Sequence, residues 1–344
     1  MTAATQNQAG QEAPLLEVKD LQISFFKDKR EIPAIRGISY TLRRGEVLGI
    51  VGESGSGKSV SSRAIMRLVA PGEKITGGEI LFDGRDVLKM TDAETAKMRG
   101  SDISMIFQDP MTSLDPLFPI GYQIEEVLKK HTSMDKAARR ARMLELLTLV
   151  GINQPERRLS QYPHEFSGGM RQRVMIAMAL ACSPKLLIAD EPTTALDVTI
   201  QAQIIDLLKS LKDRLNMAII FITHDMGVVA DICDRIAVMY AGEIVEMGSK
   251  REIFYSHQHP YTEGLLASVP KVDGAEKVPL QPIEGNPPDM TRVGKECAFA
   301  RRCPYAMRIC AKQTPPPVVG FEEDHYARCW RCCERCLQEE KGGA

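Results

Sequence analysis

The sequence has no run of the roughly 20 consecutive apolar residues that a membrane-spanning helix needs. Its first residues, Met1 to Thr5, lack the basic and then apolar pattern of a secretory signal. An excess of one charge is also missing, because 44 Lys and Arg residues face 45 Asp and Glu residues, which gives a formal net charge of -1. These absences predict a soluble protein that does not bind nucleic acid through broad electrostatics. We expect any association with a membrane to come through partner proteins.

Internal repeats are absent too, whereas the 344 residues are 44% hydrophobic, which is enough for one large domain or two modest ones. The polar stretch 1–14 predicts a disordered arm. Between about 110 and 180 the pattern becomes helical, and Ser133 is a candidate cap for a helix that Gly151 can end. Pro, Gly and charged residues at 271–290 predict a linker.

A glycine-rich segment gives the first chemical indication. Residues 52–59 read Gly-Glu-Ser-Gly-Ser-Gly-Lys-Ser and follow a buried-strand pattern at 47–51. The glycines allow backbone N–H groups to converge on an anion at the start of the next helix, so the segment predicts nucleotide binding. We expect Lys58 to neutralise phosphate charge and Ser59 to supply an oxygen to Mg²⁺. The candidate phosphate-binding residues are Gly52, Ser54, Gly55, Ser56, Gly57, Lys58 and Ser59.

Polar side chains follow three further apolar strands, at the sheet edge where ligands of α/β proteins bind. Asp190 is a candidate carboxylate for holding Mg²⁺ indirectly, and Glu191 is a candidate base or water-orienting group. His224, after another such strand, predicts contact with a γ-phosphate or with the attacking water. Gln108 carries a neutral amide that can ligate Mg²⁺ or orient water.

Residues 166–173 read Phe-Ser-Gly-Gly-Met-Arg-Gln-Arg, and with the sites above they resemble the signature of an ABC-type ATPase. The usual pattern is Leu-Ser-Gly-Gly-Gln, so Phe166 and Met170 depart from it while the Ser-Gly-Gly centre is intact. The resemblance implies that this centre grips the γ-phosphate in the site of an opposite subunit, in a head-to-tail nucleotide sandwich. One chain with one phosphate loop and one signature cannot close its own site. The candidate residues of the centre are Ser167, Gly168 and Gly169.

The same resemblance implies a role for each polar residue at the strand ends. It makes Gln108 the Q-loop glutamine, Asp190 the Walker B acid and Glu191 the catalytic carboxylate. It makes Asp197 the D-loop aspartate and His224 the switch histidine. The implied cofactors are ATP and Mg²⁺.

The fold that the resemblance implies is an α/β, P-loop ABC-type ATPase at 15–270, with a RecA-like core, an antiparallel β subdomain and the helical signature subdomain. A small Cys-rich C-terminal domain at 291–344 is expected after the linker. In such ATPases an aromatic residue of an early antiparallel strand stacks on adenine. Phe25 is our candidate and Phe26 the alternative, although packing in a core uses the same residue type.

A closer resemblance lies in residues 108–116 and 259–266, which are similar to the ATPase subunits of bacterial oligopeptide and dipeptide importers. Those subunits also tend to carry the Gly-Asn-Pro-Pro found at 285–288 and a cysteine-bearing tail. The resemblance implies ATP hydrolysis that powers peptide uptake at the cytoplasmic face of the membrane. The implied partners are two transmembrane permease subunits, a second, related ATPase subunit and an extracytoplasmic substrate-binding protein.

Several alternatives remain open at this stage. Related importers carry nickel chelates, opines or other small solutes, and the sequence does not decide the cargo or whether the ATPase subunits pair as a homodimer or a heterodimer. An ABC ATPase that acts on ribosomes or DNA usually has two cassettes or a long coiled coil, and this chain has neither. A metal-sensing regulatory module is disfavoured because Glu191 and His224 are intact.

Seven of the nine cysteines lie between Cys297 and Cys336. The spacing of four of them is similar to the peptide-importer subfamily, in which some members hold an iron–sulfur cluster. Four thiolates suit a [4Fe–4S] cluster, which is our expectation, or alternatively Zn²⁺, with free thiols as the third possibility. We expect a structural role, because the tail has few apolar residues, and no disulfides in a reducing cytoplasm. The expected ligands are Cys297, Cys303, Cys310 and Cys329.

The end of the tail is denser in cysteine than the subfamily pattern requires. Cys332 or Cys333 could replace Cys329 as the fourth ligand, or the extra thiols, including Cys336, could bind a second metal. His325 is a further possible ligand, although we interpret it as a surface histidine close to the cluster.

Overall fold

A computed structural model of the chain describes residues 13–28, 30–108, 113–194, 196–269, 282–321 and 324–333. Most of the predicted arm and linker lies outside these ranges, as do residues 109–112 of the importer-like motif and Cys336. The predicted domain boundaries therefore stay predictions.

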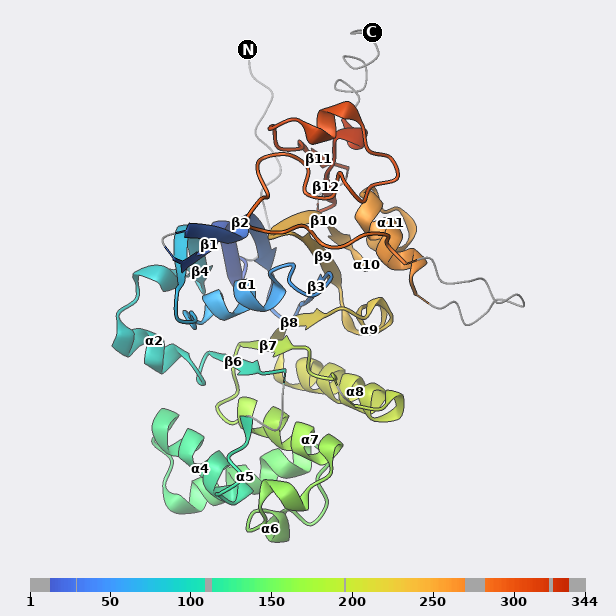
Figure 1. Cartoon of the computed structure of the whole chain (residues 1–344). Helices are drawn as coiled ribbons and strands as arrows, with labels where there is room; N and C mark the ends of the chain where they lie inside the picture. The colour runs from blue at the N-terminus through green and yellow to red at the C-terminus, as the bar shows by residue number, and fades with distance from the viewer. Residues whose placement is uncertain are drawn as a thin grey trace, which may run out of the picture.

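An eight-stranded sheet forms the centre of the molecule, with the strand order β11-β12-β10-β9-β3-β8-β7-β6 (Figure 1). Its strands are β3 (Val47–Val51), β6 (Ile103–Ile106), β7 (Leu186–Asp190), β8 (Ala218–Thr223), β9 (Arg235–Tyr240), β10 (Glu243–Ser249), β11 (Val318–Gly320) and β12 (Tyr326–Arg328). The five strands from β9 to β6 are parallel, whereas β10, β11 and β12 pair antiparallel. Every residue of β3, β7, β8 and β9 is buried, because a parallel sheet is covered on both faces.

The register of the parallel strands gathers the polar strand ends. Val51 of β3 pairs with Thr223 of β8, and Asp190 of β7 pairs with Ile222 of β8. The phosphate loop, Glu191 and the loop after β8 therefore leave the sheet from one edge, as the sequence predicts.

A second, four-stranded antiparallel sheet of order β2-β1-β4-β5 lies beside the central sheet. Its strands are β1 (Leu16–Lys27), β2 (Arg30–Leu42), β4 (Glu73–Phe82) and β5 (Arg85–Asp86). Buried residues of this sheet, such as Leu21 and Ile23, share a core with Ile50 of β3 and Ile220 of β8. This packing fixes β1, which carries Phe25, relative to the phosphate loop.

Helices cover the central sheet and form a separate group at one end of the molecule. They are α1 (Lys58–Ile65), α2 (Asp92–Met98), α4 (Ile120–His131), α5 (Lys136–Leu149), α6 (Pro155–Arg158), α7 (Gly168–Ala179), α8 (Val198–Leu215), α9 (Met226–Ile232), α10 (Lys250–Tyr255) and α11 (Pro260–Ala267). The end group, α4 to α7, is the helical signature subdomain that the sequence predicts. The cap of α5 is Asp135, which accepts the N–H of Ala138 at 2.8 Å, and the prediction of Ser133 is wrong. The helix ends before Gly151, which has a φ of 73°.

The described residues after position 290, here called the tail, extend the central sheet through β11 and β12. Strand β12 pairs with β10 through Glu246 opposite Ala327 and Met247 opposite Tyr326. His325, just before β12, is 3% exposed, so its interpretation as a surface histidine is wrong. Its Nε2 lies 3.0 Å from Oε1 of Glu246, a buried residue of β10.

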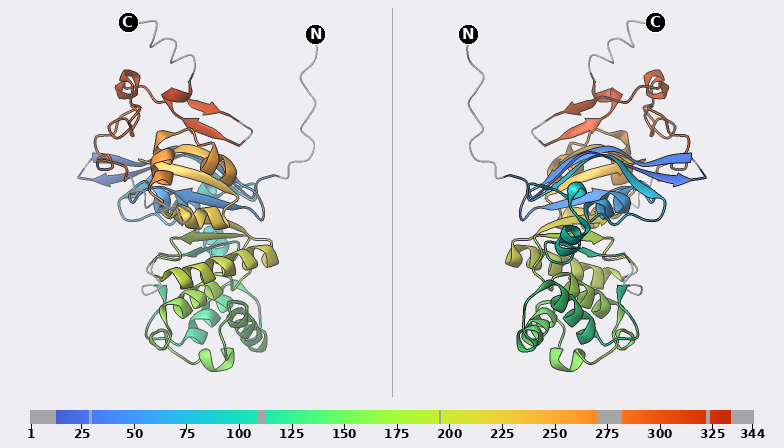
Figure 2. Two further views of the ribbon diagram at one scale, coloured as in Figure 1. Left: turned by 90° about the vertical axis from the view of Figure 1, so that its right-hand side faces the viewer. Right: turned by 90° about the vertical axis from the view of Figure 1, so that its left-hand side faces the viewer.

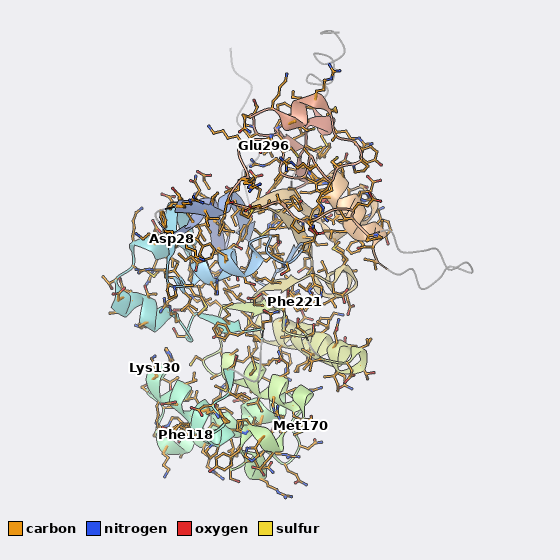
Figure 3. The ribbon with its side chains drawn as sticks, viewed as in Figure 1. Asp28, Phe118, Lys130, Met170, Phe221 and Glu296 are labelled. Carbon is orange, nitrogen blue, oxygen red and sulfur yellow. The ribbon has the colours of Figure 1, made fainter. Side chains whose placement is uncertain are left out.

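The tail and the helical subdomain lie at opposite ends of the molecule in both side views (Figure 2). Figure 3 shows the same order along the long axis, with Met170 in the helical subdomain, Phe221 in the central sheet and Glu296 in the tail. Within the part of the chain that the structure describes, no helix is both long and apolar enough to cross a membrane.

Candidate active site

The phosphate loop leaves β3 and wraps the start of α1. Gly52 has a φ of 151°, and a β-carbon there would lie 2.2 Å from the carbonyl oxygen of Met239, so only glycine fits. Gly57 caps α1 with a φ of 102°. The ammonium of Lys58 donates to the carbonyl oxygens of Gly52 at 2.7 Å and Glu53 at 2.9 Å. Burial lowers the pKa of Lys58, and nearby carboxylates act in the opposite direction.

Ser59 in the first turn of α1 lies next to Asp190 at the end of β7. The hydroxyl of Ser59 donates to Oδ1 of Asp190 at 2.9 Å. Burial raises the pKa of Asp190, and the charge of Glu191 acts in the same direction, whereas the Ser59 hydrogen bond lowers it. A hydroxyl, a carboxylate and the nearby amide of Gln108 are hard oxygen donors, so this set fits Mg²⁺.

Glu191 is the centre of a hydrogen-bond network. Its Oε2 accepts from Nε2 of Gln108 and from Oγ1 of Thr194, both at 2.9 Å, and its Oε1 lies 3.4 Å from Nδ1 of His224. Its φ of 47° is left-handed, a conformation that costs a non-glycine residue of the order of 1 kcal/mol, and its N–H donates to the Ile222 carbonyl. Gln108, Glu191 and His224 are thus brought together as the sequence predicts. Sequence reasoning missed Thr194, although it lies in the polar run after β7.

The pocket beside the phosphate loop extends from Glu191 to the antiparallel sheet. Phe25 is among its lining residues, whereas Phe26 is not, is 40% exposed and lies below the ammonium of Lys74. This placement favours Phe25 as the residue that stacks on adenine, which stays a prediction. The lining residues are Phe25, Ile32, Pro33, Ala34, Ser54, Gly55, Gly57, Lys58, Ser59, Val60, Gln108, Glu191 and Met290.

The signature residues lie elsewhere. Ser167 caps α7 by accepting the N–H of Met170, and Asp197 caps α8 by accepting the N–H of Ile200 at 2.9 Å. Neither these two caps nor Gly168 and Gly169 line the pocket of their own phosphate loop. Gly169 packs close to α8, since a β-carbon there would lie 2.8 Å from the Ile200 side chain.

Residues after α10 also reach this site, and no pattern in the sequence predicts their presence there. The hydroxyl of Tyr261 accepts the N–H of Glu53 at 2.8 Å, and Arg302 forms an ion pair with the carboxylate of Glu53. Met290 lines the pocket although it lies far along the chain from every other lining residue, all of which precede position 192.

The expected [4Fe–4S] cluster is a wrong prediction. Among the residues that the structure describes, no group of three or more His, Cys, Asp or Glu side chains is arranged to hold a metal ion, which also counts against the Zn²⁺ alternative. Burial raises the pKa of the Cys297 thiol to about 12 and also raises that of Cys303. Cys310 is likewise buried, and its carbonyl oxygen accepts the N–H of Cys297.

The later cysteines interact with other thiols. Cys329 is hydrogen-bonded to Cys332, which lowers the pKa of Cys329 and raises that of Cys332. Cys333 is disulfide-bonded, so the expectation of no disulfides is wrong. The structure thus brings Cys297, Cys303, Cys310 and Cys329 to one small pocket, without an arrangement among the described residues that would hold a metal ion.

Comparison with known proteins agrees with this geometry. The family model described as ABC transporter matches residues 35–194, and the model described as oligopeptide/dipeptide transporter, C-terminal region, matches residues 245–310. The chain is 57% identical to the oligopeptide transport ATP-binding protein OppD of Bacillus subtilis, over 92% of this chain and 88% of that protein. The chain belongs to the ABC transporter family. It is an ABC-type ATPase that is similar to the ATP-binding proteins of peptide transport.

Other members of the family agree. The dipeptide transport ATP-binding protein DppD of Bacillus subtilis is 51% identical over 92% of this chain and 94% of that protein. OppD of Salmonella typhimurium is 51% identical over 97% of this chain and 98% of that protein. The dimeric structure of MJ0796, a bacterial ABC transporter cassette, is 32% identical with a TM-score of 0.61, and the match covers 69% of this chain and 99% of the cassette.

Proposed function

We propose that this chain is the ATP-hydrolysing subunit of a bacterial ABC importer that takes up di- or oligopeptides through separate membrane subunits. The observation that carries the proposal is the combination of an ATPase site centred on Glu191 with a match at 245–310 to the C-terminal region of oligopeptide/dipeptide transporters. The high identity to OppD and DppD over nearly the whole chain supports it.

In this proposal the phosphate loop binds the ATP phosphates through its backbone N–H groups, and Lys58 neutralises part of their charge. Ser59 and Gln108 hold Mg²⁺, with Asp190 accepting the Ser59 hydroxyl behind them. Mg²⁺ supplies charge neutralisation at the β- and γ-phosphates when it is bound. Phe25 stacks on the adenine ring.

Glu191 accepts the proton of the attacking water or orients that water, and His224 stabilises the γ-phosphate side of the site. The contacts of Glu191 with Gln108, Thr194 and His224 hold its carboxylate in place before ATP hydrolysis. A positioned base of this kind needs no rearrangement during the reaction, which lowers the barrier.

Ser167, Gly168, Gly169 and Asp197 complete the site of a second ATPase subunit. Their position on α7 and before α8, away from the pocket of their own chain, supports a head-to-tail pair. The dimeric structure of the MJ0796 cassette is consistent with such a pair. The second subunit is either a copy of this chain or a related ATPase.

A groove between the core and the helical subdomain is the proposed seat of the permease subunits. It is lined by apolar residues of both parts, including Met105, Phe107, Val127 and Met175, and it adjoins Gln108. Binding there places the chain at the cytoplasmic face of the membrane, and a substrate-binding protein outside the cell delivers the peptide. ATP-dependent movement of the helical subdomain would then reach the permease through this groove.

The direct test compares the wild-type complex with Glu191→Gln. We expect ATP binding to be retained and turnover to fall by at least about 100-fold, because a general base contributes a factor of this order or more. Glu156→Gln is the matched control, since the same change falls at an exposed position of α6. Near-normal hydrolysis by Glu191→Gln would refute the assignment of Glu191.

A further inference from the structure

The phosphate loop is held from outside by residues of the C-terminal third of the chain. Arg302 donates two hydrogen bonds to the Glu53 carboxylate, from Nη1 to Oε2 at 2.7 Å and from Nη2 to Oε1 at 2.9 Å. The hydroxyl of Tyr261 accepts the Glu53 N–H at 2.8 Å. The side chain and the backbone of Glu53 are therefore both fixed by residues that lie 249 and 208 positions away in the sequence.

Arg302 is itself firmly placed, unlike an arginine of an ordinary surface ion pair. Its side chain is 5% exposed. It also donates to the carbonyl oxygens of Glu284 at 2.9 Å and Ile283 at 3.2 Å. The guanidinium carbon lies 5.8 Å from the ring centre of Tyr240 and 6.0 Å from that of Phe299. A paired and desolvated guanidinium of this kind interacts with a carboxylate more strongly than a surface pair does.

Glu53 connects this ion pair to the residues that bind phosphate. Its carbonyl oxygen accepts from the ammonium of Lys58 at 2.9 Å and from the N–H of Ser56 at 3.2 Å. Glu53 therefore links Arg302 to Lys58 through its hydrogen bonds with both residues. A shift of Glu53 would move the carbonyl group that orients the Lys58 ammonium.

The same C-terminal segment contributes a side chain to the pocket. Met290 lines the pocket together with Phe25. Four residues later, the carbonyl oxygen of Gly294 accepts a hydrogen bond from the guanidinium of Arg36 in β2. Figure 1 shows this segment, in orange, running from the region of α11 across the molecule to β2. Along the chain, the segment is thus anchored on both sides of Met290, by Arg302 before it and by Arg36 after it.

We propose that residues 282–302 are part of the ATP site, with Arg302 as a positioning residue for the phosphate loop and Met290 as a contact for the adenosine half of ATP. The inference rests on the proposed ATPase function and goes beyond it. Arg302 has two effects: it fixes the loop through Glu53, and it neutralises a carboxylate that would otherwise add negative charge beside the triphosphate. The C-terminal segment therefore influences ATP affinity from outside the nucleotide-binding motifs.

The test measures binding of the fluorescent nucleotide mant-ATP with Mg²⁺ to the full-length chain. Arg302→Met is expected to raise the Kd about tenfold, the loss expected for one charge-assisted interaction. Glu53→Gln added to Arg302→Met removes the unpaired carboxylate and is expected to recover only part of the affinity, because the loop still lacks the ion pair that fixes it. Arg301→Met is the matched control, because Arg301 is exposed and adjacent, and it should bind like the wild type.

Competition with inorganic tripolyphosphate separates the two residues. Met290→Ala should weaken mant-ATP binding about threefold while leaving tripolyphosphate binding unchanged, because Met290 contacts only the adenosine half. Arg302→Met should weaken binding of both ligands. Equal effects of Met290→Ala on both ligands would overturn the assignment of Met290.

Thermal unfolding without nucleotide checks whether the Arg302→Met variant is folded. If that variant does not fold, Arg302→Lys is used in its place. Lysine keeps the charge but cannot make the paired hydrogen bonds, so an intermediate loss of affinity is expected. Wild-type affinity in every folded Arg302 variant would overturn this inference and leave the ATPase proposal standing. A wild-type chain that does not bind mant-ATP would instead overturn the proposed function itself.

Discussion

Asp190 lies at the end of β7 with 5% of its surface exposed, and burial raises its pKa above the ordinary value of an aspartate. The folded chain therefore holds a proton on Asp190 more tightly than the unfolded chain does. At pH values above both pKa values, the ionised carboxylate opposes folding, and this cost disappears as the pH falls through the pKa of the folded state.

Because the ionised Asp190 carboxylate destabilises the folded chain, the first prediction concerns the Asp190→Asn variant in the absence of nucleotide and Mg²⁺. At pH 7 its melting temperature should exceed that of the wild type by about 2 °C, because a desolvated charge is removed. The difference should stay constant above the raised pKa of Asp190 in the folded chain and shrink as the pH falls below it. Differential scanning calorimetry across this pH range measures it, and a lower melting temperature at pH 7 would contradict the account. The same variant should lose Mg²⁺-dependent ATP hydrolysis.

The second prediction, also at the residue scale, compares Lys58→Met with Glu191→Gln. Lys58→Met removes the ammonium that faces the phosphates, so ATP binding itself should be lost. Glu191→Gln should bind ATP normally and fail only in hydrolysis, because its role belongs to the reaction. Equilibrium binding and single-turnover hydrolysis separate the two steps. Loss of binding in both variants, or in neither, would contradict the assigned roles.

The residues of this site were predictable where the chemistry is local in the sequence. Gly52 to Ser59 form one continuous loop, and Glu191 and His224 each follow a buried strand that could be recognised from its apolar pattern. Arg302 could not be predicted as a partner of Glu53, because nothing in the local pattern of either residue encodes a contact over 249 positions. Such a contact follows only from the assembled fold.

At the scale of elements, the cap of α7 combines two roles in one serine. Ser167 accepts the N–H of Met170, and the resemblance to ABC ATPases assigns its hydroxyl to the γ-phosphate of the opposite site. Ser249 provides a comparison, since it caps α10 in the same way and lies outside the signature. The two caps allow stability and turnover to be separated.

The third prediction therefore compares Ser167→Ala with Ser249→Ala. Each variant should lose about 1 kcal/mol of unfolding free energy, the usual value of an N-cap. Only Ser167→Ala should also reduce the ATP turnover of the assembled complex, by at least about tenfold. Urea unfolding and an ATPase assay provide the two readouts. Equal turnover in the two variants would show that Ser167 is a cap and no more.

Strand β10 joins the tail to the core through Glu246, which is fully buried. Its carboxylate accepts from the N–H groups of Gln258 at 2.6 Å and His259 at 3.0 Å, and it pairs with His325. The fourth prediction is that Glu246→Ala lowers the unfolding free energy by about 3 kcal/mol, because it leaves these buried groups without their acceptor. Glu156→Ala, at an exposed position, should change it by less than about 0.5 kcal/mol. An unfolding free energy equal to that of the wild type, measured in urea, would contradict this role of Glu246.

The elements were predicted better than their ends or the tail. Both Ser133 and Asp135 are good capping residues, and only the position of α5 in the fold selects Asp135. The tail gave the wrong cofactor although Cys297, Cys303, Cys310 and Cys329 line one pocket, because cysteine spacing can bring thiols together without arranging them as metal ligands. Its strand β12 has only three residues, too few for a periodic pattern to predict.

At the scale of the whole molecule, the separation of the signature from its own phosphate loop implies an association that depends on ATP. The fifth prediction is that Glu191→Gln, with ATP and Mg²⁺, forms a stable dimer that light scattering detects, whereas the chain with ADP does not. Dimerisation of the isolated chain would indicate a homodimer. Dimerisation only after addition of a related ATPase subunit would indicate a heterodimer. A chain that binds ATP and stays monomeric in both cases would contradict the sandwich.

The central sheet lies between the two ends of the molecule. The helical subdomain, with the proposed permease groove, lies at one end, and the tail lies at the other while sending residues 282–302 to the phosphate loop. In the proposed function, ATP binds between the part of the chain that carries the proposed permease groove and a part that matches the C-terminal region of oligopeptide/dipeptide transporters. This arrangement suits an ATPase whose turnover is coupled to partner subunits.

The most direct measurement is peptide uptake by proteoliposomes that contain the permease subunits, this ATPase chain with its partner, and the substrate-binding protein. The account predicts ATP-dependent accumulation of a radiolabelled oligopeptide in the wild-type complex and none with Glu191→Gln. ATP hydrolysis without peptide uptake, or uptake that persists in Glu191→Gln, would contradict it.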